Sequence, residues 1–285
     1  MLSVILPCKN EGHALRKILP ELRQILPDAE ILVVNDGSSD DTLQICEEVG
    51  VKALTHQHSL GNGAAIKSGA RAASGSILVF MDADGQHKPE DIPRLMDEYA
   101  KGYDMVVGAR SYSSQAGVHR ALANTLYNWF ASWMVGRKVE DLTSGFRIVD
   151  RSKFRQFLYL LPNGFSYPTT ITMSFFRAGY SVSYLPIIAP KRIGKSHVQL
   201  LRDGARFFLI IFKIGTLYSP LKLFLPFSAA FFMTGLCYYL YTFLTDHRFT
   251  NMSALLLITS VVVFLMGLIS EQISALNYKE TDREK

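Results

Sequence analysis

Short apolar runs alternate with amphipathic stretches through the N-terminal part of this chain. Between the runs, apolar side chains recur at helical spacing, as at Leu15, Ile18 and Leu22. Because strand and helix patterns alternate, we predict an α/β fold with a mostly parallel sheet that helices cover on both faces. The predicted strands are residues 2–7, 30–35, 51–55, 77–81 and 104–107.

The C-terminal part has a different pattern. Residues 223–244 and 249–270 carry no formally charged side chain. A helix needs roughly 20 residues to cross the hydrocarbon of a bilayer, so each stretch is long enough to span a membrane. Buried helices of a soluble domain are the alternative, but the short connection that contains Asp246 and Arg248 favours a membrane hairpin. We predict spans at about 223–244 and 250–270.

A third pattern lies between these parts. Apolar residues at helical spacing, with basic residues among them, predict an amphipathic helix at the membrane surface, although packing against the first domain is the alternative. A break follows at Pro220. The predicted segments are an α/β domain at residues 1–197, an amphipathic interfacial segment at 198–218 and a membrane anchor at 219–285.

Charged residues beside the spans predict the orientation of the anchor. The net charge is +5, with Lys213 and Lys222 before the first span and Lys279 and Arg283 after the second. Since Lys and Arg favour the cytoplasmic side, we expect a multi-pass membrane protein whose N-terminal domain and termini are cytoplasmic. No basic region precedes the first apolar run, as a secretory signal would require. No segment is typical of a nucleic-acid-binding module, and homo-oligomerisation is left open.

Two carboxylates stand directly after the most apolar predicted strand. Side chains alternate along an extended chain, so Asp82 and Asp84 point the same way while Ala83 points the other way. Neighbouring carboxylates repel each other unless a cation lies between them. A divalent ion with oxygen ligands, carrying a diphosphate on its open positions, would fit such a pair. A pair of solvated loop acids is the alternative.

Polar residues follow other predicted strands as well. Glu11 follows the first strand, Asp36 the second and Arg110 the fifth. Ligands of parallel sheets bind beyond the carboxyl ends of the strands. The convergence of several polar groups at this edge favours a binding site over solvated loops.

Four segments carry a resemblance to a known family. They are residues 3–7 (SVILP) with Asn10 and Glu11, 33–42 (VVNDGSSDDT), 61–63 (GNG) and 81–90 (MDADGQHKPE). In order and spacing they resemble the family-2 glycosyltransferases, and most of all the polyprenyl-phosphate, or dolichyl-phosphate mannose synthase-like, branch. The resemblance implies a GT-A fold, a nucleotide-sugar donor (GDP- or UDP-hexose), Mg²⁺ or Mn²⁺, and inversion at the anomeric carbon. One departure is Asn35, where the family often has an acid.

The resemblance also implies roles for individual residues. Asp84 and Gln86 would hold the metal, and Asp82 would hold the ribose or assist the metal. The implied catalytic set is Asp82, Asp84 and Asp141. The implied donor-binding set is Pro7, Glu11, Asp36, Asp82, Ala83, Asp84, Gln86, Arg110, Arg192 and Lys195. The implied acceptor-phosphate set is Arg110, Arg120, Asn124, Ser144 and Arg147.

Several of these residues also have a simpler explanation that involves no substrate. Glu11 is also favoured as an acid at a helix N-terminus. Arg192 and Lys195 belong to a basic loop that would also attract anionic lipid headgroups. Asp141 is a candidate base or orienting group, but a phosphate monoester has a second pKa near 6, so its oxygen needs no dedicated base. The aromatic residues around Trp129 and Trp133 fit either a core or an interfacial belt.

The sequence therefore favours a membrane-anchored enzyme that transfers a hexose from a nucleotide sugar to polyprenyl phosphate at the cytoplasmic membrane face. A family-2 transferase acting on a glycolipid or polysaccharide is the first alternative. Processive synthases resemble one another in a Q-x-x-R-W block, and this block is absent here. A non-catalytic nucleotide-sugar-binding membrane scaffold is the second alternative. The acidic pair and the arginines disfavour it.

Overall fold

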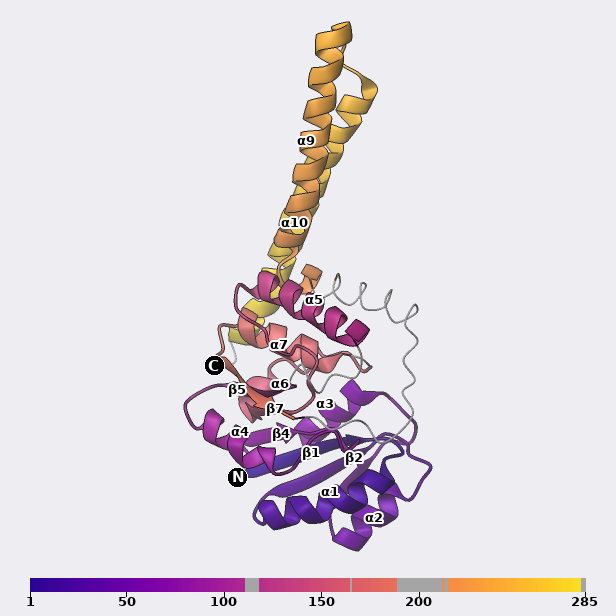
Figure 1. Cartoon of the computed structure of the whole chain (residues 1–285), viewed down its shortest axis with the longest axis vertical. Helices are drawn as coiled ribbons and strands as arrows, with labels where there is room; N and C mark the ends of the chain where they lie inside the picture. Colours follow the sequence, from indigo (N-terminus) through magenta and orange to yellow (C-terminus); the bar gives the residue numbers. More distant parts are fainter. Residues whose placement is uncertain (111–117, 165, 189–211, 213–214, 283–285) are drawn as a thin grey trace. The chain divides into compact units, whose positions relative to one another are not determined.

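The computed structural model describes residues 1–110, 118–164, 166–188, 212 and 215–282, and the side chains of all of these except 118–124 and 277–282. The chain divides into two compact units, Met1–His197 and Val198–Lys285. In Figure 1 the first unit is a sheet flanked by helices, and the second contains a pair of long helices.

A seven-stranded sheet forms the centre of the described part of the first unit, in the order β3-β2-β1-β4-β6-β5-β7. Strands β1 to β4 are mutually parallel. The predicted α/β fold with a mostly parallel sheet is confirmed. The strands are β1 (Leu2–Cys8), β2 (Glu30–Asn35), β3 (Lys52–Thr55), β4 (Ile77–Phe80), β5 (Met105–Arg110), β6 (Arg147–Asp150) and β7 (Val182–Ile187).

Strands β6 and β7 are absent from the strands that the apolar pattern predicts. β6 runs antiparallel to both β4 and β5, and β7 pairs parallel with β5 at the edge. β6 is short, and it begins with a charged residue, Arg147, so its pattern is not typical of a buried strand. Because β6 is antiparallel, its first residue lies at the edge where β4 and β5 end.

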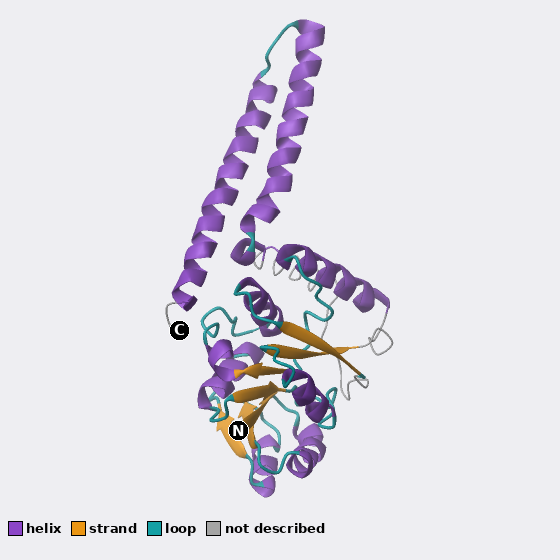
Figure 2. Ribbon diagram, turned by 90° about the vertical axis from the view of Figure 1, so that its left-hand side faces the viewer, coloured by secondary structure: helices purple, strands orange, loops and turns teal. Residues whose placement is uncertain are grey.

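Helices cover both faces of the sheet, as Figure 2 shows from the side. One face packs on α1, α2 and α4 through a shared apolar core that includes Leu15, Ile45 and Leu95. On the other face, Phe80 stacks on Phe154 with ring centroids 4.6 Å apart. The helices of this unit are α1 (Gly12–Ile25), α2 (Thr42–Val49), α3 (Asn62–Ala72), α4 (Asp91–Tyr99), α5 (Val118–Val135), α6 (Arg151–Arg155) and α7 (Tyr167–Arg177).

The side chains of β1 show how the two faces divide. Val4 and Leu6 belong to the core on the α1 side. Ile5 points to the other face, where Gly69 of α3 packs so closely that an added Cβ would lie 2.4 Å from its Cγ2. Val4, Ile5 and Leu6 are all fully buried. Such a strand, apolar on both sides, is what a sheet covered on both faces requires.

The second unit contains two long helices that run side by side, α9 (Pro220–Asp246) and α10 (Asn251–Asp282). Each is long and apolar enough to cross a membrane by length and composition, and the spans predicted from the sequence lie within them. Ser228 and Ser260 join the helices, because each hydroxyl donates to the other residue's carbonyl oxygen at 3.0 Å. Gly235 packs against Leu256. Small residues at such contacts let two helix backbones approach closely.

The amphipathic segment predicted at 198–218 lies largely outside the described residues.

Candidate active site

A cavity of about 420 Å³ lies beyond the carboxyl ends of β1, β2 and β4. The N-terminus of α3 closes one side of it with Gly61 and Asn62. Six residues that the family resemblance implies for donor binding line this one cavity: Pro7, Glu11, Asp36, Asp82, Ala83 and Asp84. Residues from four separate segments of the chain therefore meet where parallel sheets place their ligands.

Asp36 is the most highly bonded acid of the cavity. Its Oδ1 accepts hydrogen bonds from His56 Nδ1 (2.7 Å) and the Leu60 N–H (2.8 Å), and its Oδ2 accepts from the Ser59 hydroxyl (2.7 Å) and the Gly61 N–H (2.9 Å). Burial opposes ionisation of this carboxyl, but the four hydrogen bonds outweigh it and lower the pKa of Asp36 to about 2. Asp36 is thus a fixed negative charge that ties β2 to the turn before α3.

The neighbouring Asn35 departs from the family pattern, and its contact explains why an amide serves there. Its side-chain oxygen accepts a hydrogen bond from the Ser38 N–H at 2.9 Å, which closes the turn after β2. The residue is buried, with 1% of its surface exposed. An uncharged acceptor makes this bond without placing a second negative charge beside Asp36.

The acidic pair follows β4 on a turn that Gly85 makes with φ +78°, a left-handed conformation that favours glycine. Asp84 Oδ1 accepts the Gln86 N–H at 3.1 Å, so the two residues implied as metal ligands adjoin each other. Gln86 is not among the residues that line the cavity. Among the described residues, no cluster of three or more His, Cys, Asp and Glu side chains has metal-binding geometry.

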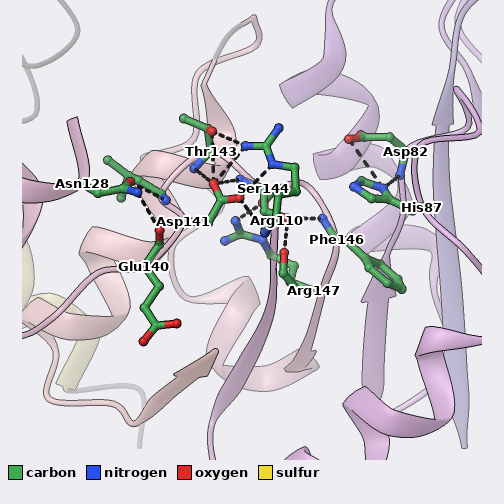
Figure 3. Close-up of polar contacts among 12 residues, drawn as sticks. Asp82, His87, Arg110, Asn128, Glu140, Asp141, Thr143, Ser144, Phe146 and Arg147 are labelled. Atoms are coloured by element: carbon green, nitrogen blue, oxygen red, sulfur yellow. Dashed lines mark hydrogen bonds and ion pairs between the residues drawn. The ribbon is translucent and has the colours of Figure 1, made fainter. Parts of the chain in front are cut away.

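His87 supports this turn from beneath. Burial lowers the pKa of His87 to about 4, against the opposing effect of the Asp84 charge, so the ring is neutral. Its Nδ1 accepts the Asp82 N–H at 3.2 Å, and the ring stacks on Phe146 with centroids 5.0 Å apart. Figure 3 shows His87 beneath the Asp82 carboxylate. A neutral acceptor inside the turn fixes the backbone of the first acid.

Arg110, at the end of β5, forms a paired salt bridge with Asp141. Its Nε donates to Asp141 Oδ2 at 2.8 Å and its Nη2 donates to Oδ1 at 2.9 Å, as Figure 3 shows. Nη2 also donates to the Thr143 hydroxyl at 2.6 Å. Among the described residues, Nη1 has no hydrogen-bond partner, and 27% of the side chain is exposed. One end of the guanidinium is therefore fixed and the other can meet a ligand.

Asp141 is an acceptor on all sides. Besides Arg110, the N–H groups of Thr143 and Ser144 donate to its Oδ1, both at 3.1 Å. Burial raises its pKa, but the hydrogen bonds and the charge of Arg110 outweigh that effect and lower the pKa below its ordinary value. A carboxylate so bonded takes up a proton poorly, so the geometry favours the orienting role of Asp141 over the role of a base.

The structure corrects two acceptor-phosphate predictions. Ser144 is buried, and its hydroxyl donates to the Gly108 carbonyl oxygen at 2.6 Å. Arg147 has no exposed surface, and its Nη1 donates to the Thr172 hydroxyl at 3.1 Å and the Pro168 carbonyl oxygen at 3.3 Å. Both side chains therefore hold the loop before β6 in place and do not meet a phosphate directly. The family resemblance implies this loop for the acceptor phosphate, but it does not show which of the side chains point inward.

Gly145 brings this loop against the acidic pair. A Cβ on Gly145 would lie 2.5 Å from Asp82 Oδ2, which is closer than real Cβ contacts. A second, smaller cavity of about 100 Å³ lies here, lined by Asn62, Asp82, Thr143, Gly145, Gly164, Tyr167 and Pro168. Asp82 therefore borders both cavities.

The side chains of four predicted residues lie outside the described part of the structure. Arg120 and Asn124 lie on α5, where their side chains are outside the described residues, and Arg192 and Lys195 lie outside them altogether. Of the aromatic residues on α5, Tyr127 is buried, while Trp129 and Trp133 are 63% and 41% exposed. These aromatic residues therefore do not form one buried core.

Comparison with known families identifies the fold that this site belongs to. The family model for glycosyl transferase family 2 matches residues 3–159, which include the cavity, the acidic pair and the Arg110–Asp141 bridge. The chain belongs to this family. A second model, described as the GtrB C-terminal hairpin, matches residues 219–276. The predicted membership in the family-2 glycosyltransferases is confirmed, and the protein is a glycosyltransferase.

Two relatives and one solved structure place this family-2 glycosyltransferase more closely. It is 30% identical over 210 residues to the undecaprenyl-phosphate mannosyltransferase of Micrococcus luteus, covering 68% of this chain and 86% of that protein. It is 31% identical over 169 residues to CsbB of Bacillus subtilis, covering 56% of this chain but only about half (51%) of CsbB.

One structural neighbour is glucosyl-3-phosphoglycerate synthase of Mycobacterium tuberculosis, solved with Mn²⁺ and UDP-glucose. It superposes with a TM-score of 0.60 at 21% identity, covering 75% of this chain and 78% of that one. At that identity the likeness shows the fold alone. The predicted GT-A fold is thereby confirmed for the family-2 glycosyltransferase described here.

Proposed function

We propose that this glycosyltransferase moves a hexose, with inversion, from a nucleotide-diphosphate sugar to polyprenyl phosphate at the cytoplasmic face of a membrane. The observation that carries the proposal is that the loop holding Asp141 packs against the acidic pair. Gly145 of this loop lies against the Asp82 carboxylate, and Asp141 fixes the guanidinium of Arg110 in a paired salt bridge. The name of the Micrococcus relative supplies the acceptor class.

The donor would lie in the larger cavity. Its nucleoside would lie near Pro7 and Asp36 at the ends of β1 and β2, and its diphosphate near Asp82 and Asp84. Cys8 also lines the cavity, but burial raises the pKa of its thiol to about 11, so the thiol stays protonated. The residues around the donor therefore bind and orient it without a covalent step through Cys8.

The acids fit a divalent ion of the Mg²⁺ or Mn²⁺ class. Asp84 and Gln86 would hold it, and their oxygen atoms are the ligands that such hard cations prefer. Among the described residues, no group of three or more His, Cys, Asp and Glu side chains could hold a metal ion. The donor diphosphate would therefore have to complete the coordination. When bound, the ion would neutralise charge on the departing diphosphate.

The acceptor phosphate would meet Arg110. A guanidinium matches phosphate oxygens with donors in fixed geometry, and Asp141 holds this one in place. The second pKa of a phosphate monoester is near 6, so the attacking oxygen is already ionised at neutral pH. Arg120 and Asn124 would assist on α5, and Arg192 and Lys195 would close over the donor diphosphate.

The membrane part of the proposal rests on α9 and α10. Their length and apolar composition suit two spans, and the match to a named hairpin family covers them. Basic residues flank both spans, so both flanks would lie at the cytoplasmic face. An enzyme anchored in this way works where a polyprenyl phosphate headgroup lies.

The test is transfer by purified full-length protein. Labelled UDP- and GDP-hexoses are supplied with polyprenyl phosphate, and the lipid product is separated by thin-layer chromatography. Asp84→Asn and EDTA are each expected to reduce transfer at least 100-fold, because charge on the leaving diphosphate is then unscreened. Asp97→Asn, at an exposed acid of α4, is the control and keeps full activity.

Transfer that survives EDTA would refute the metal assignment. Transfer to an oligosaccharide or a glycolipid but not to polyprenyl phosphate would refute the acceptor. Donor binding without transfer to any of them would leave only a binding protein.

A further inference from the structure

His56, at the end of β3, has its ring enclosed between two elements of the donor cavity. Its Nδ1 lies 2.7 Å from Asp36 Oδ1, and its Nε2 lies 2.9 Å from the hydroxyl of Ser68 on α3. Only 8% of the His56 side chain and 6% of the Asp36 side chain are exposed. Because an ionised carboxylate only accepts hydrogen bonds, the Nδ1–H donates to it. Both ring nitrogens are therefore used inside the fold.

The backbone beside the ring is fixed as well. The His56 N–H donates to the Asn35 carbonyl oxygen at 2.9 Å, and the Asp36 N–H donates to the Cys8 carbonyl oxygen at 2.8 Å. These bonds extend the β1–β2–β3 pairing by one residue past each strand. The backbone that carries the His56 ring and the Asp36 carboxylate therefore belongs to the hydrogen-bonded edge of the sheet and not to the tip of a loop.

Asp36 also bonds to the turn that forms one wall of the cavity. Its remaining acceptor positions hold Ser59, Leu60 and Gly61, the turn that leads into α3. Ser59 and Gly61 line the cavity, although Ser59 and Leu60 are otherwise exposed to solvent. Gly61 also packs closely against Asn163, but Ser59 and Leu60 have little apolar surface buried, so the hydrogen bonds to one carboxylate contribute strongly to the position of the turn.

We propose that His56 is a positioning residue of the donor site, which holds the Asp36 carboxylate in register with α3 so that the turn 59–61 forms the wall against which the nucleoside of the donor binds. This rests on the proposed nucleotide-sugar donor. His56 itself does not line the cavity, so its effect passes through Asp36. Ser68 fixes the ring from the other side.

The decisive variants separate the two ring nitrogens. His56→Leu keeps a buried side chain but removes both hydrogen bonds. In His56→Asn the side-chain N–H₂ stands near the place of Nδ1, so the bond to Asp36 is kept and the bond to Ser68 is lost. His58→Leu, at an exposed histidine two residues on, is the matched control.

The measurements are the dissociation constants of UDP and GDP with Mn²⁺ by calorimetry, KM for the donor and for the lipid acceptor, kcat, and the thermal midpoint. A hydrogen bond to a charged group contributes enough for its loss to weaken nucleotide binding about 10- to 100-fold. His56→Leu is expected to raise the nucleotide Kd and the donor KM by this factor, while the acceptor KM and kcat change less than threefold. His56→Asn recovers most of the loss, and His58→Leu behaves as the wild type.

The outcomes distinguish this inference from the proposed function. Wild-type nucleotide affinity in His56→Leu would refute the positioning role even if transfer to lipid is established. A parallel loss of donor affinity, acceptor affinity and thermal midpoint, without recovery in His56→Asn, would also refute it, because His56 would then only support the fold. Nucleotide binding that weakens as expected, in a protein that transfers no sugar, would support the inference and refute the function. No binding of UDP or GDP by the wild type would refute both.

Discussion

Asp141→Asn is the change that tests most directly how the acceptor side of the site is held together. Oδ2 of Asp141 accepts the backbone N–H and the Nε–H of Arg110, and Oδ1 accepts Nη2 of Arg110 and donors from Thr143 and Ser144. An asparagine has only one acceptor oxygen. If that oxygen keeps the bonds that Oδ1 makes, the N–H₂ group of the asparagine takes the place of Oδ2. This group would then face the backbone N–H and the Nε–H of Arg110, and no hydrogen bond could form between these donors.

The cost follows from the two bonds that Oδ2 accepts. A hydrogen bond to a charged group contributes about 1.5–3 kcal/mol, so two lost bonds would cost about 3–6 kcal/mol. Since 27% of the Arg110 side chain is exposed, water can rehydrate part of the cation, and the lower end of about 3 kcal/mol applies. For a unit of 197 residues, this lowers the thermal midpoint by roughly 6–12 °C.

The assay is thermal unfolding of the full-length protein in detergent, followed with Glu140→Gln as the neighbouring control. Among the described residues, the Glu140 carboxylate pairs only with Lys138, whose side chain is 82% exposed, so the loss of this pair changes the midpoint little. Folding lowers the pKa of Asp141 from 3.8. Its carboxylate therefore stabilises the fold above that pH, and the difference between wild type and Asp141→Asn narrows as pH falls through the folded-state pKa.

Activity separates the two roles of Asp141. An orienting role predicts a raised acceptor KM and an unchanged dependence of kcat on pH. If Asp141→Asn melted with the wild type but lost kcat and one limb of the pH profile, Asp141 would be the base, and the reasoning from its bonding would be refuted.

Three further changes test other contacts. Gly145→Ala places a methyl group against the Asp82 carboxylate, so we expect transfer to fall at least tenfold with little change in the thermal midpoint; equal activity would show that the two loops separate freely. Arg147→Lys keeps the charge but cannot reach the carbonyl oxygens of Pro168 and Ser144 together, so unfolding is expected about 2 kcal/mol easier, measured by the midpoint; an unchanged midpoint would contradict the buried network. Ser260→Leu should separate α9 from α10 and lower the detergent melting temperature far more than Ser260→Ala, which loses only about 0.6 kcal/mol of hydrogen bonding; equal effects would contradict the close packing.

The part of the site proposed for the donor could be predicted from the sequence because its residues directly follow strands with a strong apolar pattern. Asp36 and Asp82 follow runs that cannot be anything but buried, and the carboxyl ends of parallel strands meet at one edge. The apolar pattern therefore predicts that these acids lie together. What it could not give is the bonding of Asp36, since the partners come from a turn whose position depends on tertiary contacts.

The sequence predicts the part of the site proposed for the acceptor less well, for a physical reason. Strand β6, which belongs to this part, is short and starts with a charged residue, so no apolar run in the sequence predicts it. Arg147 is the first residue of β6 and Ser144 lies in the loop before it, so whether their side chains point to the site or to the interior depends on how this strand pairs and how its loop packs. His56 makes no metal-binding pattern with other residues, so the sequence does not single it out. The signal that points to it is its position one residue past β3, a strand that pairs with β2.

The antiparallel β6 has a consequence for how such a protein can diversify. The described residues that line the larger cavity, proposed for the donor, come from the chain before β5, and those proposed for the acceptor come from one later contiguous stretch. The two meet in the sheet along a seam of four residue pairs between β4 and β6, from Ile77 opposite Asp150 to Phe80 opposite Arg147. A recombination event that replaces the stretch from β5 to β7 would thus exchange what receives the sugar while leaving what delivers it unaltered.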